Sequence, residues 1–229
     1  GLKAWFDSRS TDYFALGGGG EVNAWLSRAG SVAGVAWQQG TASNQPIRVA
    51  SEPLFNGLPA VRFDGVNDWL VTSNSNAWTF LHDGAGGSAF RGFRMDSTGG
   101  ANQHILSSCT SAVQIGVQQW CPTTSFVASI TNGSGATVNN LNTTVAGHFS
   151  RDVAKWQMVG YQTNASHSRV SGSNVSVPDT AGAPSSAVSS SPLRLGATAT
   201  GVLPFKGWIA QDLYYDHVLT AGETTQLAN

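Results

Sequence analysis

The chain has 229 residues, with 12 basic and 13 acidic side chains and a formal net charge of −1. Only 11% of its residues are charged, against roughly 25% in an ordinary soluble domain. A chain this neutral, without a basic cluster, argues against nucleic acid as a partner, because phosphate contacts need Lys and Arg. The 41% hydrophobic content and eight tryptophans argue against bulk disorder. No run of about 18 apolar residues predicts a membrane span.

The first half of the chain contains a predicted short helical turn and a predicted hairpin. Glu21–Leu26 follows the tetraglycine Gly17–Gly20 and is expected to form one turn of helix, with the glycines as a flexible turn before it. Ala60–Phe63 and Trp69–Thr72 are short strand patterns on either side of a turn-rich connector, residues 64–68. Two such runs around a turn predict a β-hairpin.

The second half repeats this pattern of short strands between turn residues, and no stretch carries a helical 3.6-residue stripe. The further predicted strands are Ala89–Met95, His104–Ser108, Val113–Trp120, Phe126–Thr131, Lys155–Gln162, His167–Val170, Leu193–Gly196 and Gly207–Tyr215. Ser171–Pro192 is rich in Ser, Ala, Pro and Gly and is expected to be a long exposed loop or a loosely held edge strand.

The C-terminus carries a helix signal. Thr220 followed by Glu223 fits the capping-box pattern, which predicts a short C-terminal helix over Ala221–Leu227. We find no internal repeat and no clear linker, so residues 1–229 are expected to form a single domain. Many short strands with turn residues between them indicate an all-β sandwich of antiparallel sheets.

The two cysteines, Cys109 and Cys121, do not have the spacing of a zinc site. If Val113–Trp120 is one strand, a simple hairpin places Cys121 far from Cys109, beyond the roughly 7 Å between Cα atoms that a disulfide allows. Two free, buried thiols are therefore the favoured interpretation, with a bridge as the alternative.

Four segments together resemble the laminin-G-like branch of the concanavalin A-like lectin and glucanase superfamily. They are Leu2–Asp7 followed by Val22–Trp25, the segment Asn56–Gly65 that continues to Leu70, Phe80–Gly84, and Gly207–Asp216 that continues to Thr220. The resemblance implies a jelly roll of two antiparallel sheets packed face to face. Three of these segments, Leu2–Asp7, Asn56–Gly65 and Phe80–Gly84, are also similar to domains found in bacteriophage structural proteins, such as tail, fibre and capsid-surface proteins. This superfold hosts many unrelated functions, so the resemblance predicts fold better than function.

Glycoside hydrolysis requires paired carboxylates on one face. Laminarinase-type members of the superfamily carry them as Glu-x-Asp-x-x-Glu, and none of the three glutamates here, Glu21, Glu52 and Glu223, lies in that spacing. The best remaining pair is Asp212 and Asp216, four residues apart on a predicted strand. The favoured interpretation is one edge acid and one turn acid at the strand end, so we predict no catalytic residues and no enzyme.

The connector between Ala60–Phe63 and Trp69–Thr72 carries the most plausible cofactor site. Asp64, Asn67 and Asp68 gather oxygen ligands of the kind that Ca²⁺ prefers. The alternative is that these side chains only build the turn by bonding to local backbone. The expectation is no cofactor, with calcium as a possibility at these residues.

The tryptophans are the remaining signal. Five of the eight tryptophans lie inside strand or helix patterns and are expected in the core: Trp5, Trp25, Trp69, Trp156 and Trp208. Trp37, Trp78 and Trp120 lie nearer predicted element ends, where an exposed ring can stack on a sugar or anchor an interface. These three are the candidate ligand or interface residues, although core or subunit packing is the favoured interpretation for any one of them.

Together these observations favour a non-enzymatic structural protein on a virion surface, a capsid decoration or a tail or fibre component with possible glycan binding. Its expected partners are other virion proteins, further copies of itself and cell-surface glycans, with no membrane insertion. The alternative is a carbohydrate-binding module of a secreted, extracellular bacterial protein. A carbohydrate-active enzyme is a third hypothesis, which the missing acid motif weakens.

Overall fold

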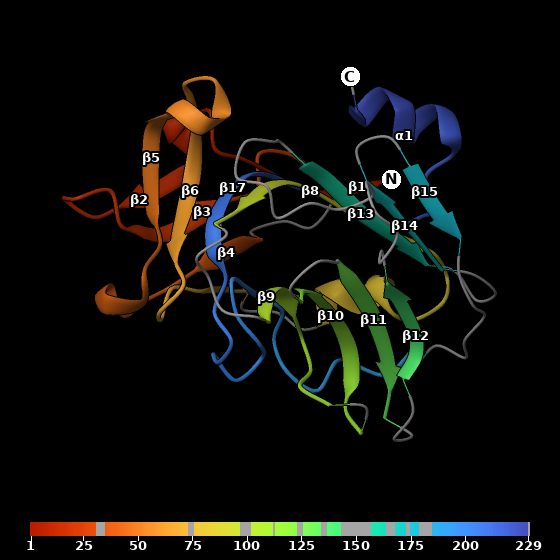
Figure 1. The fold of residues 1–229 in the computed structure, drawn as a ribbon. Helices are drawn as coiled ribbons and strands as arrows, with labels where there is room; N and C mark the ends of the chain where they lie inside the picture. The colour runs from red at the N-terminus through yellow and green to blue at the C-terminus, as the bar shows by residue number, and fades with distance from the viewer. Residues whose placement is uncertain are drawn as a thin grey trace.

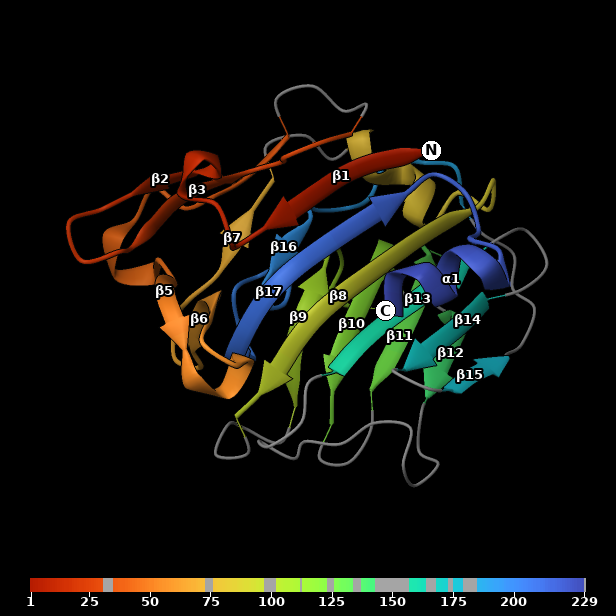
Figure 2. The same cartoon turned by 90° about the horizontal axis from the view of Figure 1, so that it is seen from above.

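The computed structural model describes residues 1–30, 35–72, 76–96, 102–111, 113–122, 126–133, 137–142, 157–163, 168–172, 175–178 and 185–228. Over these residues the chain forms two antiparallel β-sheets packed face to face, an all-β sandwich (Figures 1 and 2). The predicted fold class is confirmed. In the described part of the chain, no helix has the length and apolar character needed to cross a membrane.

The first sheet has eight strands in the order β15-β14-β13-β8-β17-β6-β5, with β1 also paired to β17. Its strands are β1 (Leu2–Asp7), β5 (Ile47–Glu52), β6 (Leu58–Asp64), β8 (Gly87–Met95), β13 (Gln157–Thr163), β14 (Ser168–Gly172), β15 (Val175–Pro178) and β17 (Lys206–Tyr215). The edge strand β15 falls inside Ser171–Pro192, in agreement with the edge-strand alternative for that part of the segment.

The second sheet has nine strands in the order β12-β11-β10-β9-β16-β7-β4-β3-β2. Its strands are β2 (Phe14–Leu16), β3 (Val22–Leu26), β4 (Ala36–Gln38), β7 (Leu70–Val71), β9 (Gln103–Ser107), β10 (Ile115–Cys121), β11 (Val127–Asn132), β12 (Thr137–Asn142) and β16 (Arg194–Leu195). Within the described residues, four 3₁₀ turns connect strands: η1 (Thr11–Tyr13), η2 (Ala42–Asn44), η3 (Pro53–Phe55) and η4 (Asn76–Leu81).

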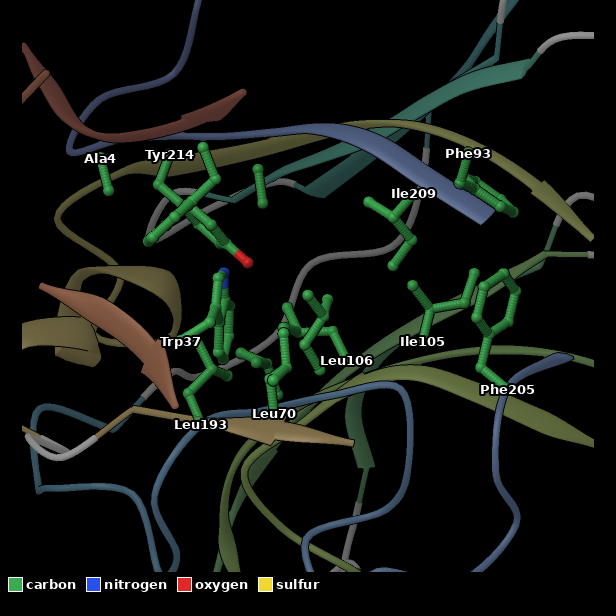
Figure 3. Packing of buried hydrophobic residues seen from close by; sticks show 14 of the residues in the cluster. Ala4, Trp37, Leu70, Phe93, Ile105, Leu106, Leu193, Phe205, Ile209 and Tyr214 are labelled. Carbon is green, nitrogen blue, oxygen red and sulfur yellow. The ribbon is translucent and has the colours of Figure 1, made fainter. Parts of the chain in front are cut away.

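The hydrophobic core lies between the two sheets. Ile209 and Tyr214 of the first sheet face Leu106 of the second, and Trp37 points its indole nitrogen towards the Tyr214 hydroxyl (Figure 3). Both cysteines are free and buried, as favoured from the sequence. Burial raises the pKa of the Cys109 thiol to about 11, so this side chain packs as a neutral group.

The C-terminal helix α1 (Ala221–Ala228) is confirmed, together with its cap. The Thr220 backbone N–H donates to Glu223 Oε2 (2.8 Å), and the Glu223 N–H donates to Thr220 Oγ1 (3.3 Å). This is the reciprocal bonding that the capping box predicts. Figure 2 shows the helix on the outer face of the first sheet, where Leu227 packs against a cluster that contains Phe90 and Leu213.

Two predictions of local structure are wrong. The segment Glu21–Leu26 forms strand β3 over Val22–Leu26 instead of a helical turn, because Val22 and Trp25 are buried in the core and the strand pairs with β2 and β4. The predicted hairpin is absent as well: β6 belongs to the first sheet and β7 to the second. The connector 64–68 therefore crosses between sheets, and Phe63 and Leu70 enter the same core from opposite sides.

A β-bulge divides strand β17. Its pairing with β8 shifts between Ile209 and Gln211, and a one-residue shift moves the following side chains to the opposite face. Asp212 consequently points inward, where it is fully buried, and Leu213 points outward under α1. The hydrophobic residues of Ile209–Tyr215 are therefore shared between the two faces of the sheet.

Candidate functional site

Trp37 and Trp78, two of the three candidate ligand or interface residues, are core residues. Trp37 is fully buried and Trp78 is 2% exposed. The two rings stack with centroids 6.0 Å apart and an interplanar angle of 15°, and Trp78 also meets the edge of Tyr214 at 4.7 Å. Position near the end of an element did not imply exposure here, because η4 and β4 both direct their tryptophans into the space between the sheets.

Trp120 lies on the outer face of the second sheet. Its strand β10 directs Val117 and Cys121 into the core, and side chains of opposite parity, Gln118 and Trp120, therefore face away from it. The Trp120 ring is half-buried and stacks on His104 of the neighbouring strand β9, with centroids 5.7 Å apart and 13° between the planes. Of the three candidate tryptophans, Trp120 alone remains accessible to a ligand.

His104 forms the floor beside Trp120. The side chain is 7% exposed, and burial lowers its pKa to about 4. The imidazole is therefore neutral at physiological pH, and its ring acts as an uncharged stacking surface. Within the described part of the chain its Nδ1 atom has no hydrogen-bond partner. Its backbone N–H donates to the Leu203 carbonyl (3.0 Å), which joins strand β9 to the loop that follows β16.

That loop, residues 198–203, is one wall of the site. The Thr198 N–H donates to the Val202 carbonyl (2.9 Å), and the Val202 N–H returns a bond to Thr198 Oγ1 (3.0 Å). The Thr200 hydroxyl lies 3.2 Å from that of Thr198. Leu203 has a backbone φ of 51°, a left-handed conformation that costs a residue with a Cβ atom of the order of 1 kcal/mol. The wall is held by its own hydrogen bonds before any ligand arrives.

The opposite wall comes from the connection between β9 and β10. Gln118 Nε2 donates to the Cys109 carbonyl (2.6 Å), and Gln114 Oε1 accepts from both the backbone N–H (2.6 Å) and the hydroxyl (2.9 Å) of Thr110. Between the two walls lies an open hollow of about 340 Å³. Its lining residues are Asn102, His104, Thr110, Gln118, Trp120, Thr198, Thr200, Val202 and Leu203.

The lining is uncharged. It combines amides and hydroxyls with one indole face and two aliphatic side chains, Val202 and Leu203, which are 57% and 44% exposed. None of the described residues that line the hollow is an acid or a basic Lys or Arg. Such a surface stacks on an apolar ring face and hydrogen-bonds hydroxyl groups, and it offers no carboxylate for acid–base chemistry.

The candidate calcium residues build the turn. Asp64 Oδ1 accepts from the backbone N–H groups of Val66 (2.8 Å) and Asn67 (3.3 Å), and Asp68 Oδ2 accepts from the Asp64 N–H (2.8 Å). Asn67 donates its side-chain amide to Asn44 (3.3 Å). These are the local bonds of the turn interpretation.

Burial raises the pKa of Asp68 to about 7, which disfavours the charged form that a cation needs. The described residues contain no group of three or more His, Cys, Asp or Glu side chains that could hold a metal ion. Calcium at Asp64, Asn67 and Asp68 stays a prediction, and the hydrogen bonds of these side chains do not favour it.

Asp212 and Asp216, the best remaining pair of acids, do not share a site. Asp212 is inside the sandwich, where it accepts from Arg91, and Tyr214 donates its hydroxyl to Asp212 Oδ2 (2.7 Å). Asp216 lies just past the end of β17 and pairs with Lys3 (2.9 Å) and the N-terminal amine. Asp212 is therefore a buried core acid, which corrects its interpretation as an edge acid, and Asp216 is the strand-end acid that was expected.

The sequence pattern identified Trp120 and missed the remainder of its surroundings. Gln118 was detectable, since it alternates with core residues on the same strand as Trp120. The loop 198–203 was not, because its position against β9 depends on long-range pairing of β16 with β9. No local signal in residues 198–203 indicates which strand they contact.

Comparison with known proteins agrees with the fold. Neither a protein-family model nor a curated protein sequence matches the chain. Among solved structures, the binding domain of Paraclostridial Mosquitocidal Protein 1 is similar with a TM-score of 0.64 and 10% identity, over 100% of this chain and 52% of that chain. The binding domain of botulinum neurotoxin serotype D/C follows with a TM-score of 0.61 and 11% identity, over 100% and 51%.

A third similar structure is the CBM40 of the Ruminococcus gnavus IT-sialidase, solved with bound α2,3 sialyllactose. Its TM-score is 0.57 at 13% identity, over 74% of this chain and 96% of that chain. The chain spans about half the length of the toxin binding domains and nearly the whole of the CBM40. At such low identities the likeness concerns the fold, and the chain has the β-sandwich fold of these lectin-like binding domains.

Proposed function

We propose that this domain binds carbohydrate in the hollow beside Trp120. The observation that carries the proposal is an accessible indole ring set among amide and hydroxyl groups, in a hollow whose described lining residues carry no charge. The C–H groups on one face of a pyranose are weakly positive and pack on the negative face of an aromatic ring. The hydroxyls at the edge of the sugar then find donors and acceptors in Asn102, Gln118 and the threonines of the loop.

The site is suited to a neutral sugar unit. Its aromatic floor is a stack of Trp120 on the neutral ring of His104, and its walls are held by internal hydrogen bonds. A preformed site loses little conformational entropy on binding. Because no charged side chain is found among the described residues that line the hollow, a sugar without a carboxylate or sulfate fits it without leaving an unpaired charge.

The similar structures support this proposal through their own ligands. The CBM40 is described as bound to α2,3 sialyllactose, and cell entry of botulinum neurotoxin type C is described as dependent on two ganglioside molecules. The toxin domains are about twice as long as this chain, so a ligand of the whole domain need not bind the matched half. The CBM40, matched over 96% of its length, is the more direct support.

The place of the protein in a virion remains a proposal from the sequence resemblance alone. A capsid or tail component, with virion proteins or further copies as partners, is compatible with glycan binding, and so is a secreted extracellular module. Trp37, offered as an interface anchor, is fully buried and unavailable to a partner, so we place glycan binding first. The native mass by light scattering tests for self-assembly: a stable trimer or larger ring supports it.

The test of carbohydrate binding is a glycan array followed by calorimetric titration of the strongest neutral glycan. Trp120→Ala is expected to weaken binding at least ten-fold, with an unchanged circular dichroism spectrum. Trp208→Ala is the matched control, because Trp208 is also half-buried but lies on the outer face of the other sheet. An array without hits contradicts the proposal, and loss of binding in Trp208→Ala alone places the site elsewhere.

A further inference from the structure

Arg194 lies on the same outer face as Trp120. It belongs to strand β16, in which its neighbour Leu195 is buried in the core. Side chains of consecutive strand residues point to opposite faces, so Arg194 projects outward from the second sheet. It is paired directly with Ser107 of β9, and Ser107 is paired with Gln118 of β10.

This register sets the distance between Arg194 and the Trp120 hollow. Gln118 lines the hollow and stands two strands away from Arg194 in the same cross-strand row. Neighbouring strands are about 4.8 Å apart, so the two backbone positions are separated by roughly 10 Å. A disaccharide covers this span.

The guanidinium of Arg194 also contacts the wall of the hollow. Its Nη1 atom donates a long hydrogen bond to the Thr198 carbonyl (3.4 Å). A Cβ atom placed on Gly201 would lie only 2.7 Å from Nη1, so the loop and the guanidinium are in close contact, and the φ of 83° at Gly201 is a conformation that favours glycine. Arg194 therefore lies against the same loop that forms one wall of the Trp120 hollow.

Arg194 is a cation without a counter-ion in the described part of the chain. Its guanidinium carbon lies 4.0 Å from the centroid of the Trp69 ring, and its buried Nε atom has no hydrogen-bond partner. Burial lowers its pKa from the ordinary value. A partly desolvated guanidinium that is satisfied only by a ring face and one long bond gains from an anion that can take its free N–H groups.

From these contacts we infer that Arg194, seated on Trp69, is an anion-binding subsite next to the Trp120 hollow. The ligand class is then an acidic oligosaccharide, in which a neutral unit stacks on Trp120 and the adjoining unit presents a carboxylate or sulfate to Arg194. This inference rests on the proposed function, because it places both units of one ligand on the same face.

The test compares matched glycans that share one neutral core. Lactose, 3′-sialyllactose and 3′-sulfolactose are titrated into the wild-type protein, Arg194→Gln and Trp120→Ala, after an array that carries neutral, sialylated and sulfated forms of further cores. Where lactose is a poor core, the best matched trio from the array replaces it. The wild type is expected to bind at least one acidic form about ten-fold more tightly than its neutral core.

Arg194→Gln is expected to abolish this preference and to leave the affinity for the neutral core unchanged. Added salt should reduce the preference in the wild type, as expected for a charge contact. Equal binding of neutral and acidic forms by the wild type overturns the inference but leaves the proposed function intact. An equal loss for neutral and acidic forms in Arg194→Gln also overturns it, since Arg194 then only supports the loop. If neither the neutral nor the acidic forms bind, the inference and the proposed function are both contradicted.

Discussion

Removal of the Asp212 carboxylate tests the ion pair at the centre of the sandwich. Arg91 Nη2 donates to Asp212 and to the Tyr214 hydroxyl (2.8 Å), and its Nη1 donates to Gln119 Oε1 across the core (2.7 Å). Arg91 is 2% exposed and Asp212 is fully buried. Strands β8 and β17 of one sheet are thereby connected to β10 of the other.

The expected cost follows from what Asp212→Ala leaves behind. Arg91 keeps its charge, loses its only carboxylate among the described residues and has no access to water. Tyr214 loses the acceptor for its hydroxyl. Removing one partner of a buried ion pair typically lowers the stability of the folded state by about 3–5 kcal/mol. We therefore expect Asp212→Ala to lower the free energy of unfolding by about that amount.

The assay is equilibrium urea unfolding followed by tryptophan fluorescence. Asp216→Ala is the control, since this acid is on the surface and its pairs with Lys3 and the N-terminus are worth about 0–1 kcal/mol. A double replacement, Arg91→Met with Asp212→Leu, should recover most of the loss, because it removes the unpaired charge. A cost for Asp212→Ala no larger than that for Asp216→Ala would refute the reasoning.

Three further predictions concern titration and capping. Asp68 has a pKa of about 7 in the folded protein against 3.8 in the unfolded chain. The folded state therefore holds the extra proton, and the free energy of unfolding falls as pH rises from about 4 to 7. Asp68→Asn should remove that fall and raise the free energy of unfolding at pH 8 by about 2–4 kcal/mol, measured by urea titration. Because the pKa of His104 is lowered to about 4, glycan affinity should be constant from pH 8 to 5 and lost below about 4, as calorimetry can check. Thr220→Ala should cost about 1 kcal/mol and accelerate amide exchange at the start of α1.

The strand pattern in the sequence predicted most of the strands but not which of the two sheets each strand belongs to. The segments Ala60–Phe63 and Trp69–Thr72 are both strands, and Val61 and Phe63 face the core as their alternation indicates. Local turn chemistry between them is satisfied equally by a hairpin and by a crossing. The choice between a hairpin and a crossing depends on how the two sheets pack on each other. This packing is a long-range property, which the alternation within one segment does not predict.

Asp212 shows a second limit, set by the bulge. Because Ile209 faces the core, strict alternation along the strand would place Gln211 in the core and Asp212 outside. The register shift after Ile209 reverses this and brings Asp212 opposite Arg91 of β8. The bulge has no clear signature in the sequence, but an acid on one central strand and an arginine on its neighbour are each unusual inside a core. Their pairing accounts for both.

Strand parity accounts for the different outcomes of Trp37 and Trp120, which both belong to the second sheet. In β4 the residue after Trp37, Gln38, is exposed, and the indole points inward. In β10 the flanking Gln119 and Cys121 are buried, and the indole points outward beside Gln118. The same residue type thus supports the core in one strand and lines an open hollow in the other. The neighbours one residue away, more than distance from the strand end, distinguish a structural tryptophan from one that is available to a ligand.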